Sequence, residues 1–213
     1  MQKQILPVST IGLALAAFSS TPLAAQSGGL ELAVVVMVGM LAALVYTVVA
    51  FVRTWRGRGG QSSSPPAWMD ALIPGLVIVG LGVAGYLAYV ETQAVPAVCG
   101  PVGDCNAVQS SSYSKLFGVL PVGVVGLIGY ALILVAWLWG HFRSDRLADY
   151  APLAVLALAV FGVLVSIRLT YLELFVIYAV CIWCLTSAVI MTLLMLLALP
   201  PALATFAPET DEA

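Results

Sequence analysis

The chain has 213 residues, of which 62% are hydrophobic and only 8% are charged, and its net charge at pH 7 is −2. Soluble domains contain about 45–50% apolar and about 25% charged residues, so this composition excludes a soluble enzyme. No basic block is present that would hold nucleic acid. The composition therefore indicates one compact integral membrane protein, whose solvent is the lipid bilayer.

The first 26 residues have the order of regions found in a secretory signal. Lys3 gives a short basic start, residues 11–18 are apolar and residues 22–26 are small or polar apart from Leu23. A cut after Ala25 fits poorly, because Leu23 stands where a small residue is preferred. Both a cleaved signal peptide and an uncleaved signal anchor remain open for residues 1–26.

Five apolar runs follow, each about as long as the 20 residues that a helix needs to cross the hydrocarbon layer. They cover residues 30–52, 71–90, 117–139, 150–175 and 181–199. We therefore expect an all-α integral membrane protein.

The charges of the connections orient these helices. Residues 53–67 carry three arginines and a Gly/Ser/Pro-rich stretch, and the 140–149 connection carries two more arginines. The 91–116 connection has a single basic residue, Lys115. Because basic loops stay in the cytoplasm, we expect 53–67 to be a cytoplasmic linker and 201–213 an acidic cytoplasmic tail. The 91–116 loop and the start of the last helix then face outward.

All four cysteines, at positions 99, 105, 181 and 184, map to this outer side. Thiols outside the cytoplasm tend to be oxidised, and four cysteines permit three pairings. Cys181-Ile-Trp-Cys184 starts a helix, where the dipole and free N–H groups favour a thiolate. A structural role as buried small hydrophobes is the alternative. A metal site is not expected, because five residues separate Cys99 from Cys105, which fits no common zinc spacing.

Beyond the cysteines, an ordered set of residues resembles the bacterial members of the vitamin K epoxide reductase family, over about residues 68–200. The set comprises Cys99, Cys105, Val108, Ser111, Tyr113, Phe117-Gly118, Pro121, Gly126, Tyr130, Tyr171-Leu-Glu-Leu and Cys181-Ile-Trp-Cys184. A related group of quinone-linked thiol oxidases places its C-x-x-C pair before the loop pair, whereas here the loop pair comes first.

The resemblance implies a four-helix transmembrane bundle as the core, within residues 68–200, with residues 30–52 as one extra N-terminal transmembrane helix. It also implies a quinone-dependent thiol oxidoreductase of the cytoplasmic (inner) membrane, with its active site on the extracytoplasmic face. The redox disulfides would be Cys99–Cys105 and Cys181–Cys184, joined during turnover by a transient Cys105–Cys181 bond. Electrons would pass from a separate thioredoxin-like protein outside the cytoplasm to ubiquinone or menaquinone, without a metal, and would support disulfide formation.

The resemblance also suggests a quinone pocket near Ser111, Val122, Trp183 and Ala188. Vertebrate members hydrogen-bond the quinone through an Asn and a Tyr, and Val122 and Ala188 stand at those positions here. A simple quinone is therefore a better expected acceptor than an epoxide. Two alternatives remain: a reductase of a quinone epoxide or other small substrate on the same core, and a non-enzymatic membrane subunit with structural cysteines.

Overall fold

The structure, a computed structural model, describes residues 22–57, 67–99, 103–116 and 119–206. Helices dominate it, with one short β-ribbon. The elements are α2 (Pro22–Trp55), α3 (Ala67–Gln93), α4 (Cys105–Ser110), η1 (Ser112–Ser114), β1 (Lys115–Leu116), β2 (Leu120–Pro121), α5 (Val122–Phe142), η2 (Ala148–Tyr150), α6 (Ala151–Leu172), the π-helix η3 (Glu173–Ile177) and α7 (Ile182–Ala204).

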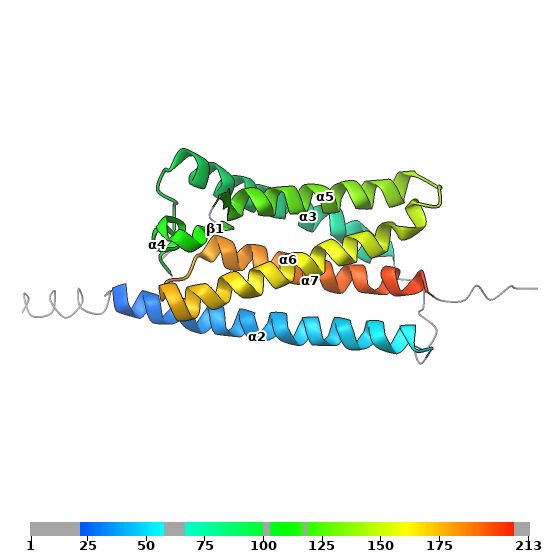
Figure 1. Cartoon of the computed structure of the whole chain (residues 1–213), viewed down its shortest axis with the longest axis horizontal. Helices are drawn as coiled ribbons and strands as arrows, with labels where there is room; N and C mark the ends of the chain where they lie inside the picture. Colours follow the sequence, from blue (N-terminus) through cyan, green and yellow to red (C-terminus); the bar gives the residue numbers. More distant parts are fainter. Residues whose placement is uncertain (1–21, 58–66, 100–102, 117–118, 207–213) are drawn as a thin grey trace, which may run out of the picture.

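Five helical stretches of the described chain are long and apolar enough to cross a membrane. Helices α3, α5, α6 and α7 form a four-helix bundle, and α2 lies along its outside against α7 and α6 (Figure 1). The predicted all-α bundle with an extra N-terminal helix is therefore confirmed.

Helix α7 forms much of the centre of the bundle, because α6, α3 and α2 all pack onto it. Leu194 and Met195 of α7 are fully buried, as is Tyr130 of α5. The ring of Tyr130 lies directly against the backbone of Gly80 in α3, where even a Cβ atom would collide with it. Glycine at position 80 thus allows α3 and α5 to approach closely.

The extra helix α2 buries one narrow stripe. Ala33, Met40 and Thr47 are almost inaccessible and recur every seven residues, so they share the face toward the bundle. The opposite face exposes large apolar side chains, including Val35, Val38 and Val45, as expected of a surface in contact with lipid.

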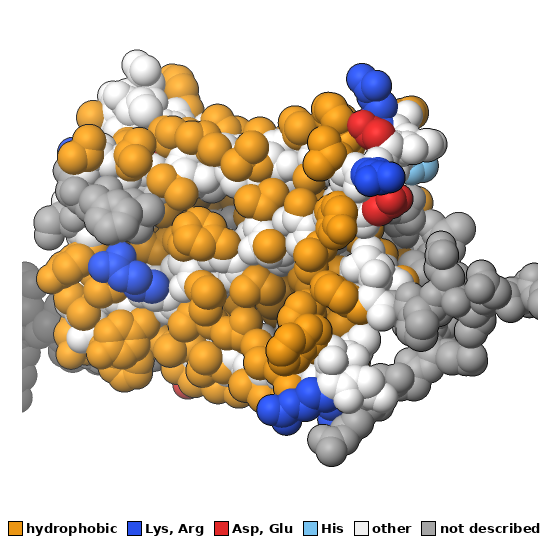
Figure 2. Space-filling model, turned by 45° about the vertical axis from the view of Figure 1, so that its right-hand side comes forward, with side chains coloured by type: hydrophobic (Ala, Val, Ile, Leu, Met, Phe, Trp, Pro, Cys, Tyr) orange, Lys and Arg blue, Asp and Glu red, His pale blue; other side chains and the backbone are white. Residues whose placement is uncertain are grey.

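The two ends of the bundle differ in chemistry. Apolar side chains cover most of the length of the face in Figure 2, and acidic and basic side chains gather toward the ends of the helices. The end of α2 and the α5–α6 connection carry Arg53, Arg56, Arg143 and Arg146. This basic end is opposite the end that bears α4 and the start of α7 (Figure 1).

Some predicted boundaries need correction. The third span begins at Val122 rather than at residue 117, because Leu120–Pro121 pairs antiparallel with Lys115–Leu116 before the helix starts. Helix α2 begins at Pro22, within the segment predicted to end a signal. Residues 1–21, 58–66 and 207–213, to which most of the predicted signal, linker and tail belong, lie outside the described residues.

Candidate active site

The four cysteines meet at the end of the bundle that carries α4. Cys99 follows α3, Cys105 is the first residue of α4, Cys181 is the N-cap of α7 and Cys184 lies in its first turn. All four are free thiols in this structure. Cys105 and Cys181 are fully buried, whereas Cys99 and Cys184 are partly accessible.

The thiols form a continuous line rather than two separate pairs. Cys105 N–H donates to the Cys99 sulfur at 3.2 Å, and the Cys105 thiol lies beside that of Cys181. The Cys181 thiol in turn lies beside that of Cys184. The partly accessible thiols therefore stand at the ends of the line, and the buried thiols join them.

Burial and contacts among the thiols raise the pKa values of Cys99, Cys105 and Cys181 above that of an ordinary thiol. Burial raises the pKa of Cys99 to about 11, with a further contribution from its hydrogen bond to Cys105. The pKa of Cys105 is raised, first by its hydrogen bond with Cys181 and then by burial.

The sequence predicts lowered thiol pKa values at the start of α7, but the pKa of Cys181 is raised. Its hydrogen bond with Cys105 lowers the pKa, whereas the hydrogen bond with Cys184 and burial raise it, and the net shift is upward. The interaction with Cys184 and the loss of hydration together outweigh the contacts that would lower the pKa.

The segment that carries Cys99 is held by side chains from three elements. Asn106 bonds both backbone groups of Ala97, accepting from its N–H at 2.7 Å and donating to its carbonyl at 3.3 Å. The Tyr86 hydroxyl accepts from Val98 N–H at 2.7 Å, and Trp183 Nε1–H donates to the Val98 carbonyl at 2.9 Å. The rings of Tyr86 and Trp183 pack at 4.7 Å.

A second set of contacts joins the Cys105 loop to the segment before Cys181. Asp104 caps α4 by accepting from Ala107 N–H at 3.0 Å, and its own N–H donates to the Val180 carbonyl at 3.0 Å. Gly103 has φ +87° and lies so close to Val180 that a Cβ would strike the carbonyl oxygen. These contacts hold Cys105 against Cys181.

A large apolar cavity of about 340 Å³ adjoins the inner end of the line of thiols. Cys184 lies in its wall, and all four bundle helices contribute, with small residues such as Gly126, Gly129 and Gly162 making the space. Exposed lining residues on α5 and α6, among them Ile128 and Phe161, place its edge at the lipid-facing surface. Its size is that of a typical small-molecule pocket.

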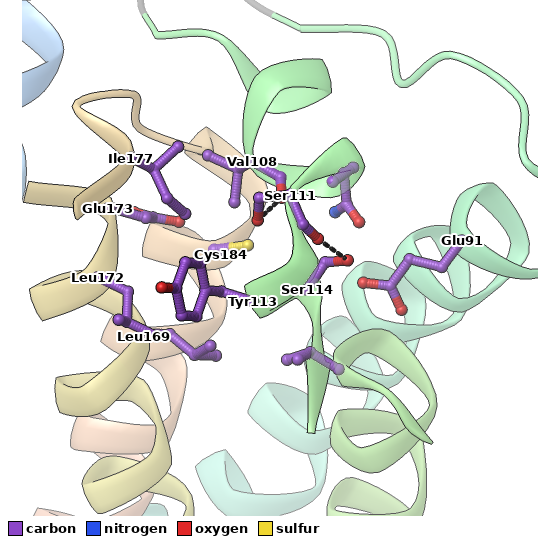
Figure 3. A pocket seen from close by; sticks show the side chains of 12 residues that line it. Glu91, Val108, Ser111, Tyr113, Ser114, Leu169, Leu172, Glu173, Ile177 and Cys184 are labelled. Atoms are coloured by element: carbon purple, nitrogen blue, oxygen red, sulfur yellow. Dashed lines mark hydrogen bonds between the residues drawn. The ribbon is translucent and has the colours of Figure 1, made fainter. Parts of the chain in front are cut away.

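A second, much smaller cavity of about 20 Å³ lies beside the first (Figure 3). Val122, Leu169 and Cys184 line both. In Figure 3 the carboxylate of Glu173 and the sulfur of Cys184 point toward the same space, with the ring of Tyr113 beside them.

Two glutamates line this small cavity, and only one of them has a hydrogen-bond partner for its carboxylate. Glu91 caps α5, because its carboxylate accepts from Gly123 N–H at 2.7 Å. Glu173 is 2% exposed, and neither of its carboxylate oxygens has a hydrogen-bond partner. The Cys181 backbone and the Cys184 side chain lie close to the Glu173 carboxylate, but neither meets the geometry of a hydrogen bond.

The four residues predicted for a quinone pocket separate into two groups. Val122 lines both cavities and Ser111 lines the small one. Trp183 instead packs on Tyr86 and binds the Cys99 segment, and Ala188 is buried in the apolar core. Neither of them lines either cavity next to Cys184.

Three residues that the sequence did not mark as functional take part in this arrangement: Asn106, Gln109 and Glu173. A glutamate inside an apolar span is itself a signal of function, and Glu173 in Tyr171-Leu-Glu-Leu carries that signal. For Asn106 and Gln109 the sequence offers none, since both lie in an ordinary polar loop.

The sequence model of the vitamin K epoxide reductase family matches residues 71–199, well over half of the chain. The chain belongs to this family. No curated protein matches its sequence. The match runs from the first turn of α3 into the last turns of α7 and leaves out all of α2, which is therefore an addition to the family core.

Membership of the vitamin K epoxide reductase family makes the chain a multi-pass membrane protein and an oxidoreductase that works through cysteines. The family is linked to quinones and works with thioredoxin-like partners in general. In the described residues, no group of three or more His, Cys, Asp and Glu side chains is placed to hold a metal ion.

Proposed function

We propose that the protein is a quinone-dependent thiol oxidase, which takes two electrons from a thioredoxin-like protein outside the cytoplasm and passes them to a membrane quinone. The observation that carries the proposal is the continuous line of thiols from the partly accessible Cys99 to Cys184 in the wall of the apolar cavity. Each neighbouring pair can exchange a disulfide without a long movement of the chain.

The relay starts with both pairs oxidised. A thiolate of the donor attacks Cys99, and the second donor thiol then releases the donor as a disulfide and leaves Cys99 and Cys105 reduced. Cys105 attacks Cys181 and frees Cys184. Cys99 next attacks Cys105, which restores the first disulfide and frees Cys181.

The second pair then reduces the quinone. The thiols of Cys181 and Cys184 lose two electrons and two protons as they form a disulfide, and the quinone gains both and leaves as a quinol. The net reaction oxidises one donor dithiol for each quinol formed, so it supports disulfide formation in exported proteins. The apolar walls of the cavity suit a quinone ring and the start of its isoprenoid tail.

The side of the membrane follows from charge. The basic residues of the α2 end and the α5–α6 connection lie at the end opposite the cysteines, and basic ends remain in the cytoplasm. The thiols therefore face the extracytoplasmic side of the inner membrane, the side to which thioredoxin-like donors are exported.

Quinol formation, followed by absorbance, tests this function. Purified protein in detergent is mixed with a reduced thioredoxin-like donor and with ubiquinone or menaquinone analogues, and Cys184→Ala is compared with Thr192→Ala on the same helix. We expect donor-dependent quinol with the native chain and Thr192→Ala, and none with Cys184→Ala. If the folded native chain makes no quinol but reduces a quinone epoxide, the acceptor assignment is wrong.

A further inference from the structure

Three buried side-chain oxygens in the described part of the chain have no hydrogen-bond partner: Gln109 Oε1 and both carboxylate oxygens of Glu173. Both residues line the same cavity of about 20 Å³, next to Cys184. Buried polar atoms without a partner are costly, by about 1–3 kcal/mol each. Their convergence on one small space indicates that this space has a polar occupant.

The size and chemistry of the space fit one water molecule. A buried water needs about 10–15 Å³ and two to four polar partners. All three oxygens are acceptors on residues that line this space, so a group bound among them must bring hydrogen atoms. A water brings two, one for Gln109 and one for the Glu173 carboxylate.

The local backbone directs Glu173 into this space. Glu173 is the first residue of the π-helix that continues α6, and this π-helix ends at Tyr178 in a left-handed conformation with φ 56°. Single π-turns are uncommon and occur frequently at functional sites. The wider turn places the carboxylate inside the bundle rather than toward lipid.

We propose that Glu173 and a water molecule bound by Gln109 form a proton relay between the Cys184 thiol and the quinone. The inference rests on the proposed function, because only a quinone that is being reduced needs the protons. The small cavity and the large one share Cys184, Val122 and Leu169 in their walls, so the relay ends beside the site proposed for the quinone.

The relay leaves the reaction balanced. The Glu173 carboxylate takes the proton of the Cys184 S–H bond, which leaves a thiolate to donate electrons. The proton then crosses the water to a quinone oxygen as the electrons arrive, and Glu173 returns to its starting state. The second proton of the quinol comes from Cys181 as the disulfide closes.

Single-turnover quinone reduction by pre-reduced enzyme, with no donor protein present, tests the relay. We expect Glu173→Gln to slow quinone reduction by about 100-fold, the lower range of the contribution of proton transfer by a placed side chain. Glu173→Asp restores part of the rate, since a water can span the shorter side chain. Gln109→Met, of similar size but without an oxygen, slows the reaction several-fold.

The pH profile separates a relay from a structural role. We expect the rate of Glu173→Gln to rise steadily with pH, because hydroxide replaces the missing base, whereas the native rate levels off. The other titratable side chains that line this space are Glu91, Tyr113 and Cys184, and all stay unchanged in the variant. Arg168 is exposed and lies outside the cavity lining.

Glu31→Gln is the matched control, since Glu31 is exposed on α2 and its loss should leave the rate unchanged. A Glu173→Gln variant with the native rate and native pH profile would overturn the relay.

An infrared difference spectrum between the oxidised and reduced enzyme needs no quinone and therefore tests the relay separately from the proposed function. We expect a carboxyl band that changes with the redox state of Cys184 and is absent in Glu173→Gln. If no carboxyl band changes, the relay is wrong. If the band changes but the native enzyme reduces no quinone, the proposed acceptor is wrong and the coupling between Glu173 and Cys184 stands.

Discussion

The thiols of Cys105 and Cys181 lie side by side in one cluster, and both side chains are fully buried. The two residues lie 76 positions apart in the sequence (181 − 105), and they meet because Gly103 and Asp104 pack on the carbonyl of Val180. A donor protein cannot touch the buried Cys181 directly, so in the proposed relay electrons reach the second pair through Cys105.

The contact between Gly103 and Val180 should control how closely Cys105 approaches Cys181. Gly103→Ala puts a Cβ against the Val180 carbonyl at a positive φ, which costs about 1–2 kcal/mol from backbone strain alone. We expect a lower Tm in detergent and slower electron transfer from Cys99 to Cys184. Gly82→Ala is the control, because a Cβ there meets open space. Equal Tm values for the two variants would show that the close approach is unimportant.

The reactivity of Cys99 should depend on pH over an unusually alkaline range. Its pKa is raised to about 11, and only the thiolate reacts with iodoacetamide. Below its pKa, the thiolate fraction of a thiol grows about tenfold for each pH unit. In reduced enzyme, alkylation of Cys99 should therefore still accelerate at pH 10, measured by peptide mass spectrometry. A rate that levels off below pH 9, as for an ordinary thiol, would be inconsistent with the burial described.

The apolar cavity should set the affinity for quinone. Gly129 lines it, and a Cβ there would make only an ordinary contact with Met191 at 4.0 Å. Gly129→Ala should thus have little effect. Gly129→Leu fills the space, and overpacking costs about 1–3 kcal/mol, so the KM for quinone should rise roughly tenfold or more. The KM for the thiol donor is the internal control, and a change in that constant alone would place the quinone elsewhere.

The orientation of the bundle in the membrane can be tested in spheroplasts, whose cytoplasmic membrane is intact but exposed to added reagents. A membrane-impermeant thiol reagent should label reduced Cys99 from outside. An added cysteine at position 146, in an exposed part of the basic α5–α6 connection, should react only after the membrane is opened. The reverse pattern would place the thiols in the cytoplasm and exclude an exported donor.

The sequence was a good guide to the fold because transmembrane helices are required by long apolar runs without charge. All five spans are present. The late start of α5 at Val122 was missed, because the pairing of Lys115 with Pro121 is a tertiary contact in a stretch that is as apolar as a helix.

The site was predicted less completely. The family resemblance implied two cysteine pairs, but their arrangement in one line depends on how the α4 loop packs on the start of α7. The direction of a side chain was also out of reach: Trp183 lies between Cys181 and Cys184 in sequence, yet it faces the Cys99 segment. The inward turn of Glu173 depends on a π-helix, which no hydropathy pattern indicates.

The most direct test of the account is to trap the bond between the two buried thiols. Cys99→Ser with Cys184→Ser leaves only Cys105 and Cys181, and the account predicts that mild oxidation joins them completely in the folded protein, as seen by mass spectrometry of the linked peptides. Cys105→Ser with Cys184→Ser, which leaves Cys99 and Cys181, should form little disulfide under the same conditions. If the first variant stays reduced while the second oxidises readily, electrons do not pass from Cys105 to Cys181 and the proposed relay is wrong.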